Sequence, residues 1–124
     1  MTVLLVLLGG ATGAVLRQLV AQRLGRTGDG WRAFPWATFA VNMTGSLLLG
    51  IVAGAAATGR VPQTLLLLVG TGFCGALTTF STFGHESVRL VEVRREAVAA
   101  AYVAVSVLLG FALVALGWWL ASTA

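Results

Sequence analysis

The sequence predicts an all-α membrane protein with four transmembrane helices, the third of them broken in mid-membrane. Hydrophobic residues make up 58% of the 124 residues and charged residues only 10%, against about 25% charged residues in soluble domains. The apolar residues form four stretches, each near the roughly 20 residues that one spanning helix needs. Little chain remains outside these stretches, so we expect a single domain over residues 1–124 whose function lies inside the helix bundle.

The first two stretches are uninterrupted. The first runs from about Thr2 to Leu24; it lacks the positively charged start of a signal peptide, so we expect a retained helix. A loop over residues 25–34, rich in glycine and charge, follows it. The second stretch opens at Pro35, which suits the first turn of a helix because proline has no N–H to leave unpaired. It runs to about Thr58.

The third stretch opens at Pro62 by the same logic and contains the break. We expect helix over Gln63–Phe73, a break around Cys74–Thr79, and a second helical half that continues toward Leu90. Each glycine in this stretch costs about 1 kcal/mol relative to alanine in a helix, and hydroxyl groups find no partner in lipid. A broken helix at membrane depth is tolerated only where it is buried in protein or lines a water-filled cavity, so we expect the chain to move something polar. The residues responsible are Gly70, Gly72, Gly75, Thr78, Thr79, Ser81 and Thr82.

The last stretch, from Ala97 to about Leu120, has no charged residue, and the tryptophans at 118 and 119 suit a membrane interface. Small residues recur at four-residue spacing, which lets helices approach closely in lipid. Such pairs serve either packing within one bundle or contact between subunits. Because four short helices do not easily enclose a polar path, we expect an oligomer. The pairs are Gly9/Gly13, Gly50/Gly54, Ala97/Ala101 and Ala100/Ala104.

The formal charge of +4 comes from eight basic residues, all arginine, against four acidic ones. The arginines lie at helix ends and in loops, so we interpret them as topology signals and expect no nucleic-acid partner. The positive-inside rule places the two arginine-rich loops in the cytoplasm and both termini outside. Only Arg60 lies on the opposite side from the other loop arginines, which are Arg23, Arg26, Arg32, Arg89, Arg94 and Arg95.

A short set of polar and aromatic residues within the spans could carry the function. Arg17 lies well inside the first span, where a charge is either functional or snorkels to the interface. The Asn42 amide offers donors that suit an anion or an interhelix hydrogen bond. Phe80 and Phe83, three residues apart, share a helix face and have positive ring edges that can face an anion. Further hydroxyl donors are Ser81, Thr82, Tyr102 and Ser106.

The sequence lacks the residues that several classes of function require. No carboxylate lies at the centre of a predicted span, since Glu86 follows the phenylalanine pair and the other acids are in loops; a proton-coupled carrier needs a buried one. His85 is the only histidine and Cys74 the only cysteine, which leaves no set of catalytic residues and no thiol metal cluster. We therefore expect no enzyme.

Three segments, taken together and in order, resemble the fluoride channels known as the Fluc or CrcB family. They are Gly9–Arg17, Pro35–Gly50 and Gly72–Phe83, which lie on the corresponding spans of a four-span chain. The resemblance implies an antiparallel dimer in the cell membrane of a bacterium, with two narrow pores that pass fluoride passively and exclude chloride.

The resemblance also implies roles for individual residues. Asn42, Phe80 and Phe83 would contact fluoride along the pore, and Tyr102 and Ser106 would begin a polar track on the last helix. Two positions farther along that track, Gly110 and Val114, lack the hydroxyl found in some members.

The break in the third helix matches the place where family members hold a structural sodium ion at the dimer centre. The resemblance implies that backbone carbonyls of Gly75 and Thr78 hold it. Arg17 and Glu86 match family positions as well.

Two features leave alternatives open. The arginine bias favours one orientation, so the oppositely oriented partner is either a second copy of this chain or a paralogue. A small four-span exporter of the small-multidrug-resistance type is the alternative function, but it needs a carboxylate in the first span, where this chain has Arg17. A membrane scaffold would have no use for a broken helix.

Overall fold

The computed structural model describes residues 1–25 and 33–124. The third span is a composite of α3 (Gln63–Leu65), the π-helical η2 (Leu66–Cys74) and α4 (Gly75–Leu77), which follow one another without interruption, and of α5 (Phe80–Glu92), which continues them after the break. Within these described residues, four helical segments are long and apolar enough to cross a membrane, which confirms the four-span fold class. The elements are α1 (Thr2–Leu24), α2 (Trp36–Ala57), α3 (Gln63–Leu65), η2 (Leu66–Cys74), α4 (Gly75–Leu77), α5 (Phe80–Glu92) and α6 (Glu96–Thr123).

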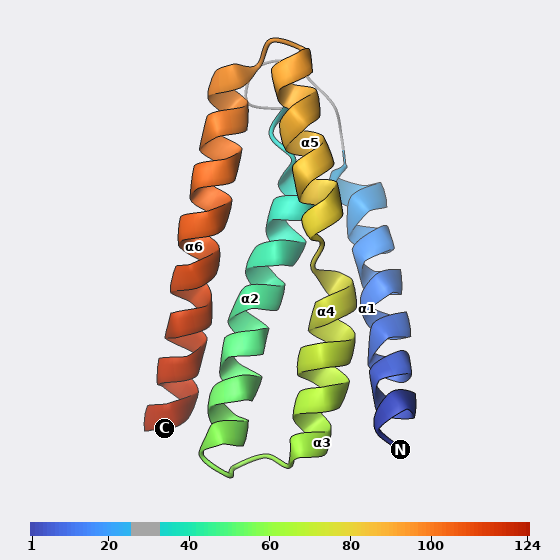
Figure 1. Ribbon diagram of the computed structural model, residues 1–124, viewed down its shortest axis with the longest axis vertical. Helices are drawn as coiled ribbons and strands as arrows, with labels where there is room; N and C mark the ends of the chain where they lie inside the picture. Colours follow the sequence, from blue (N-terminus) through green and yellow to red (C-terminus); the bar gives the residue numbers. More distant parts are fainter. Residues whose placement is uncertain (26–32) are drawn as a thin grey trace.

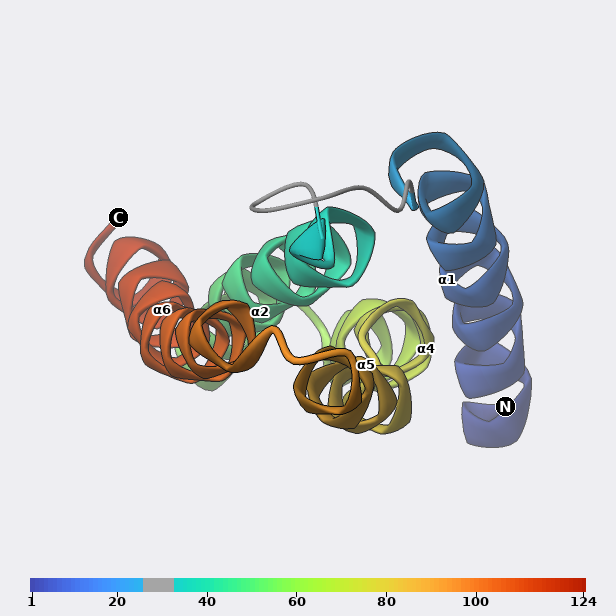
Figure 2. The same cartoon turned by 90° about the horizontal axis from the view of Figure 1, so that it is seen from above.

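The spans form a slightly splayed bundle with α1 and α6 on its two flanks (Figure 2). Helix α2 packs mainly against α6, whereas α1 packs mainly against η2 and α4. Both termini and the turn over residues 58–62 lie at one end (Figure 1). Four of the loop arginines lie at the other end and Arg60 at this one, as expected; Arg26, Asp29 and Arg32 lie outside the described residues. Which end faces the cytoplasm stays a prediction.

The glycine pairs at four-residue spacing bring helices together within the chain. A β-carbon on Gly9 would overlap the carbonyl oxygen of Leu68, and one on Gly13 would overlap that of Phe73. Gly50 approaches the backbone of α6 in the same way. In lipid, where no hydrophobic effect drives helices together, such close backbone contact is a main source of cohesion. Of the two alternatives, packing inside the bundle therefore holds for the glycine pairs.

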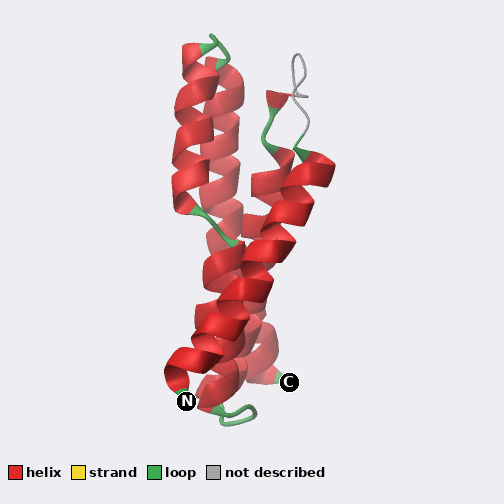
Figure 3. Cartoon of the chain, turned by 90° about the vertical axis from the view of Figure 1, so that its right-hand side faces the viewer, coloured by secondary structure: helices red, strands yellow, loops and turns green. Residues whose placement is uncertain are grey.

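The break in the third span is shorter than expected. We expected it around Cys74–Thr79, but helical backbone continues to Leu77, and only Thr78 and Thr79 are extended. Figure 3 shows the resulting gap as a short loop between two helical pieces. The glycines do not interrupt the helix because packing offsets their cost: a β-carbon on Gly72 would lie 2.8 Å from the carbonyl oxygen of Val6 in α1.

Helices α2 and α5 end in the same hydrogen-bonded motif, with one residue in the left-handed region. That residue is Gly59 (φ 73°) after α2 and Arg94 (φ 61°) after α5. Such C-terminal motifs usually place glycine there because it has no β-carbon to clash. In each motif the next amide donates to a carbonyl five residues earlier, Arg60 N to Ala55 O at 2.9 Å and Arg95 N to Leu90 O at 2.8 Å.

Candidate functional site

A groove of about 550 Å³ runs between α2, the third span and α6. Its walls combine apolar side chains with amide and hydroxyl groups, and no acidic or basic residue lines it within the described part of the chain. The groove thus offers hydrogen-bond donors in an otherwise apolar setting. The polar and aromatic residues that line it include Asn42, Ser46, Thr71, Thr78, Thr79, Phe80, Phe83 and Ser106.

Asn42 pairs with the extended backbone of the break. Its Oδ1 accepts a 2.9 Å hydrogen bond from the amide of Thr79, and its Nδ2 donates to the Thr79 carbonyl at 3.4 Å. The asparagine of α2 therefore takes the place of the partners that the broken helix loses. An amide nitrogen has two hydrogens, so one remains for the groove. The interhelix hydrogen bond weighed for Asn42 is present, and its contact with an anion stays a prediction.

Thr79 also begins α5. Its Oγ1 accepts a hydrogen bond from the amide of Thr82 at 3.2 Å, the usual arrangement of a threonine cap. The hydroxyls of Ser81 and Thr82 lie 3.3 and 3.1 Å from Thr79 Oγ1. Both side chains are exposed, and neither lines the groove. The structure thus places these two residues beside the break but outside the groove.

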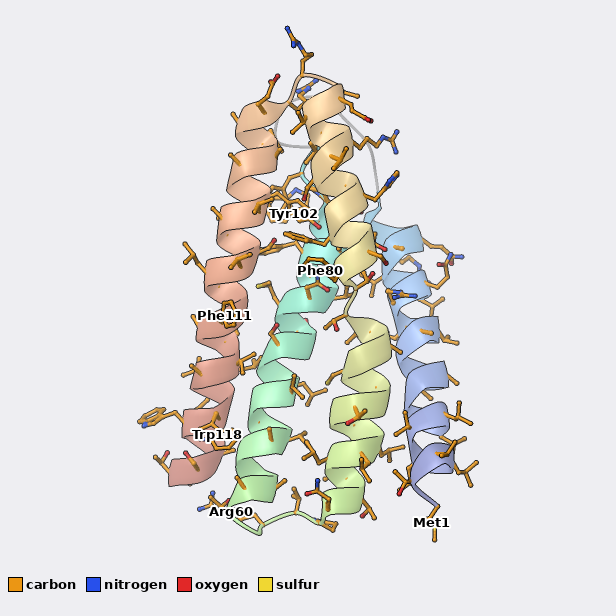
Figure 4. The ribbon with its side chains drawn as sticks, in the orientation of Figure 1. Met1, Arg60, Phe80, Tyr102, Phe111 and Trp118 are labelled. Carbon is orange, nitrogen blue, oxygen red and sulfur yellow. The ribbon has the colours of Figure 1, made fainter. Side chains whose placement is uncertain are left out.

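Phe80, Phe83 and Tyr102 form a row of ring contacts that joins the third span to α6; Figure 4 labels the two end rings, Phe80 and Tyr102. The ring centroids of Phe80 and Phe83 are 6.0 Å apart, and those of Phe83 and Tyr102 are 5.0 Å apart. Tyr102 is fully buried, whereas 85% of Phe80 is exposed. The helix face predicted for the phenylalanine pair is present, but one side of Phe80 has no cover within this chain.

The carboxylate of Glu86 accepts hydrogen bonds from two other spans. Thr38 Oγ1 of α2 donates to Glu86 Oε1 at 2.9 Å, and the Tyr102 hydroxyl of α6 donates to Glu86 Oε2 at 2.8 Å. Sequence reasoning placed Glu86 after the phenylalanine pair and missed Thr38. The sequence could have indicated Thr38, because its hydroxyl comes four residues before Asn42 and therefore lies on the same helix face.

Ser106 and Tyr102 share a face of α6 but differ in their partners. The Tyr102 hydroxyl is engaged with Glu86, whereas Ser106 Oγ is the one buried side-chain polar atom without a hydrogen-bond partner among the described residues. An unsatisfied buried hydroxyl is costly, and Ser106 lines the groove. A polar guest in the groove would satisfy it.

The carbonyls of Gly75 and Thr78 lose their usual helical donors at the break. In an unbroken helix the amide of Thr79 would donate to Gly75, but here it donates to Asn42. The amide of Thr82 would donate to Thr78, but here it donates to Thr79 Oγ1. Gly75 is exposed and has open space around it. The two oxygens therefore fit a hard cation such as sodium, which unwound helix backbone commonly holds.

Arg17 lies apart from these residues. It is half-buried on α1 and does not line the groove. Within the described part of the chain it forms no ion pair or hydrogen bond, so the structure does not bring it into the site.

The chain matches known proteins over nearly its full length. A family model described as "CrcB-like protein, Camphor Resistance (CrcB)" matches residues 4–118. The fluoride-specific ion channel FluC 2 of Rhodococcus jostii is 52% identical over 122 residues, which cover 98% of this chain and 100% of the relative. FluC 1 of Frankia casuarinae is 50% identical over 119 residues, with 92% and 91% covered. FluC 2 of Mycobacterium tuberculosis is 48% identical over 120 residues, with 94% and 87% covered.

Proposed function

Because this chain belongs to the CrcB family, we propose that it is a fluoride-selective ion channel that passively exports cytoplasmic fluoride and so reduces fluoride toxicity. The observation that carries the proposal is the buried hydroxyl of Ser106. Among the described residues it has no hydrogen-bond partner, and none of those that line its groove is charged. Fluoride is small and strongly hydrated, so a pore must replace its water with close donors. The groove supplies such donors.

We assign different roles to the residues of the proposed pore. Asn42 and Ser106 donate to fluoride directly, and the ring edges of Phe80 and Phe83 face the ion. Tyr102 acts through its contacts, because its hydroxyl is engaged with Glu86 and its ring supports Phe83. Ser81 and Thr82 contribute their hydroxyls only where a second subunit extends the groove.

Transport through such a pore needs no energy source. A potential that is negative inside drives an anion outward by about 2.3 kcal/mol per charge per 100 mV. Fluoride that enters a cell as neutral HF and ionises there is expelled by this field. An ion channel of this kind is not an enzyme, and it works as a multi-pass protein of the cell membrane.

The groove needs a second subunit to become a pore. It is open on the side where Phe80 is exposed, and polar groups at membrane depth require cover by protein or water. We infer that the partner lies in the opposite orientation, as an antiparallel dimer. It is either a second copy of this chain or an oppositely oriented paralogue, since the arginine bias favours one orientation for this chain.

A labelling experiment separates these partners. Cys74 is first replaced by alanine, and one cysteine is placed at Gly59 or at Arg94, at opposite ends of the bundle. An impermeant maleimide is applied to intact cells. If the chain has a single orientation, the reagent labels only one of the two sites, and this result supports the paralogue. Equal labelling of both sites supports the homodimer.

We propose that the carbonyls of Gly75 and Thr78 hold a structural sodium ion at the dimer centre. The ion would supply positive charge that joins the two broken helices across the interface. Exchange of sodium for a large organic cation during purification should then lower the melting temperature and favour monomers. Unchanged stability after exchange would argue against the site.

The experiment that tests the function is fluoride efflux from liposomes containing the purified protein, followed with a fluoride electrode after addition of a potassium ionophore. We expect rapid efflux of fluoride but not chloride, and loss of efflux for Phe80→Ile. Well-folded protein without efflux, alone and when reconstituted with a paralogue, would contradict the proposal.

A further inference from the structure

We propose that Ser46 is a further fluoride-coordinating residue, which supplies from α2 the hydroxyl that α6 lacks at Gly110. The inference rests on the proposed function and assigns a donor to that groove. Three observations carry it: the free hydroxyl of Ser46, its position opposite Gly110, and its alignment with the two donors already described.

The Ser46 hydroxyl has no partner within the described residues. A serine or threonine in a helix commonly donates to a carbonyl three or four residues earlier. Among the described residues, six hydroxyls do so: those of Thr12, Thr58, Thr78, Ser87, Ser122 and Thr123. Ser46 forms no such bond, although it lies in the middle of α2 and is half-buried. Its hydrogen is therefore free for the groove that it lines.

Gly110 leaves the space that the Ser46 hydroxyl faces. A β-carbon on Gly110 would lie 3.7 Å from Ser46 Oγ and 3.6 Å from Met43 Cε. Both distances are ordinary van der Waals contacts, so a small side chain would fit there. A hydroxyl on residue 110 would occupy the same part of the groove as that of Ser46.

Ser46 continues a pattern across the two facing helices. It lies one turn after Asn42 on α2, and Gly110 lies one turn after Ser106 on α6; residues four apart share a helix face. The free hydrogen of Asn42 and the hydroxyls of Ser46 and Ser106 thus surround one section of the groove. An anion that has lost its water gains more from three donors than from two.

The test compares fluoride efflux of Ser46→Ala with that of the unchanged channel. Loss of a hydrogen bond to a charged group lowers the rate by about tenfold or more when that step limits transport. Thr44→Val is the matched control, because Thr44 is on the same helix, is exposed, and does not line the groove. We expect its efflux to stay within about twofold of the unchanged channel.

Restoring the hydroxyl from the other helix distinguishes coordination from packing. We expect Ser46→Ala combined with Gly110→Ser to recover efflux to within about threefold of the unchanged channel, and Ser46→Thr to conduct normally. Size-exclusion chromatography checks that each variant folds. Full efflux by Ser46→Ala, or a slow variant that Gly110→Ser leaves slow, overturns the inference. If the unchanged channel conducts fluoride, either of these two results leaves the proposed function standing. If neither the unchanged channel nor any variant conducts, the proposed function itself is contradicted.

Discussion

Replacing Asn42 with leucine should destabilise the protein by about 2–4 kcal/mol, because Asn42 pairs with the broken backbone. The amide of Thr79 lies 2.9 Å from Asn42 Oδ1, and an unsatisfied amide away from water costs about 1–3 kcal/mol. The second bond, from Nδ2 to the Thr79 carbonyl, is longer at 3.4 Å, so its loss adds about 1 kcal/mol. Leucine is close to asparagine in size, so the change removes the two bonds without leaving a large cavity.

The free energy of unfolding is measured for this variant by titration with SDS in mixed micelles, followed by tryptophan fluorescence. Thr44→Val serves as the control, because it removes a hydroxyl of the same helix that has no role at the break. Its stability should change by less than about 0.5 kcal/mol. If Asn42→Leu were as stable as the control, the break would not depend on Asn42, and the reasoning would be refuted.

Three further predictions concern packing and helix ends. Gly13→Ala should cost about 1–3 kcal/mol, because the new methyl group overlaps a carbonyl of the third span, whereas Gly10→Ala on the same helix should be tolerated; melting temperatures in detergent decide. Arg94→Gly should stabilise the protein by about 1 kcal/mol, because glycine adopts the left-handed backbone without strain, and Gly59→Ala should destabilise it by a similar amount. SDS titration should therefore give changes of opposite sign in the free energy of unfolding for the two variants. Phe34→Ala should cost about 3 kcal/mol, because this buried ring packs edge-on against that of Tyr102; an unchanged midpoint would contradict this.

The four spans were predictable because their cause lies in the sequence itself. Apolar length determines the spans, and prolines at 35 and 62 mark two of the starts, so the predicted bounds agree with the structure to within a few residues. The predicted extent of the break was wrong, because the prediction rested on helix propensity at glycines such as Gly72, which is only a local quantity. The approach of α1 to that glycine depends on tertiary packing, which overrides a cost of about 1 kcal/mol.

The site was predictable as a set of residue types but not as a set of contacts. The pattern indicated Asn42 as a donor, yet its pairing with Thr79 depends on where the third helix breaks. The contact between Glu86 and Thr38 joins residues 48 positions apart, a separation that helical periodicity does not address. Ser81 and Thr82 share a segment with Phe80 but lie on a different side of α5, since successive helical residues point in different directions.

The placement of Glu86 explains how a carboxylate can lie near an anion path. A bare negative charge beside the groove would repel fluoride, but the two oxygens of Glu86 accept hydrogen bonds from Thr38 and Tyr102. These bonds hold the carboxylate between α2, α5 and α6 and turn it away from the groove lining. The cost is that both hydroxyls are used, so neither donates to a passing ion. On α6 the Tyr102 hydroxyl is therefore engaged with the charge of Glu86. The Ser106 hydroxyl has no partner among the described residues and stays available for its proposed contact with the anion.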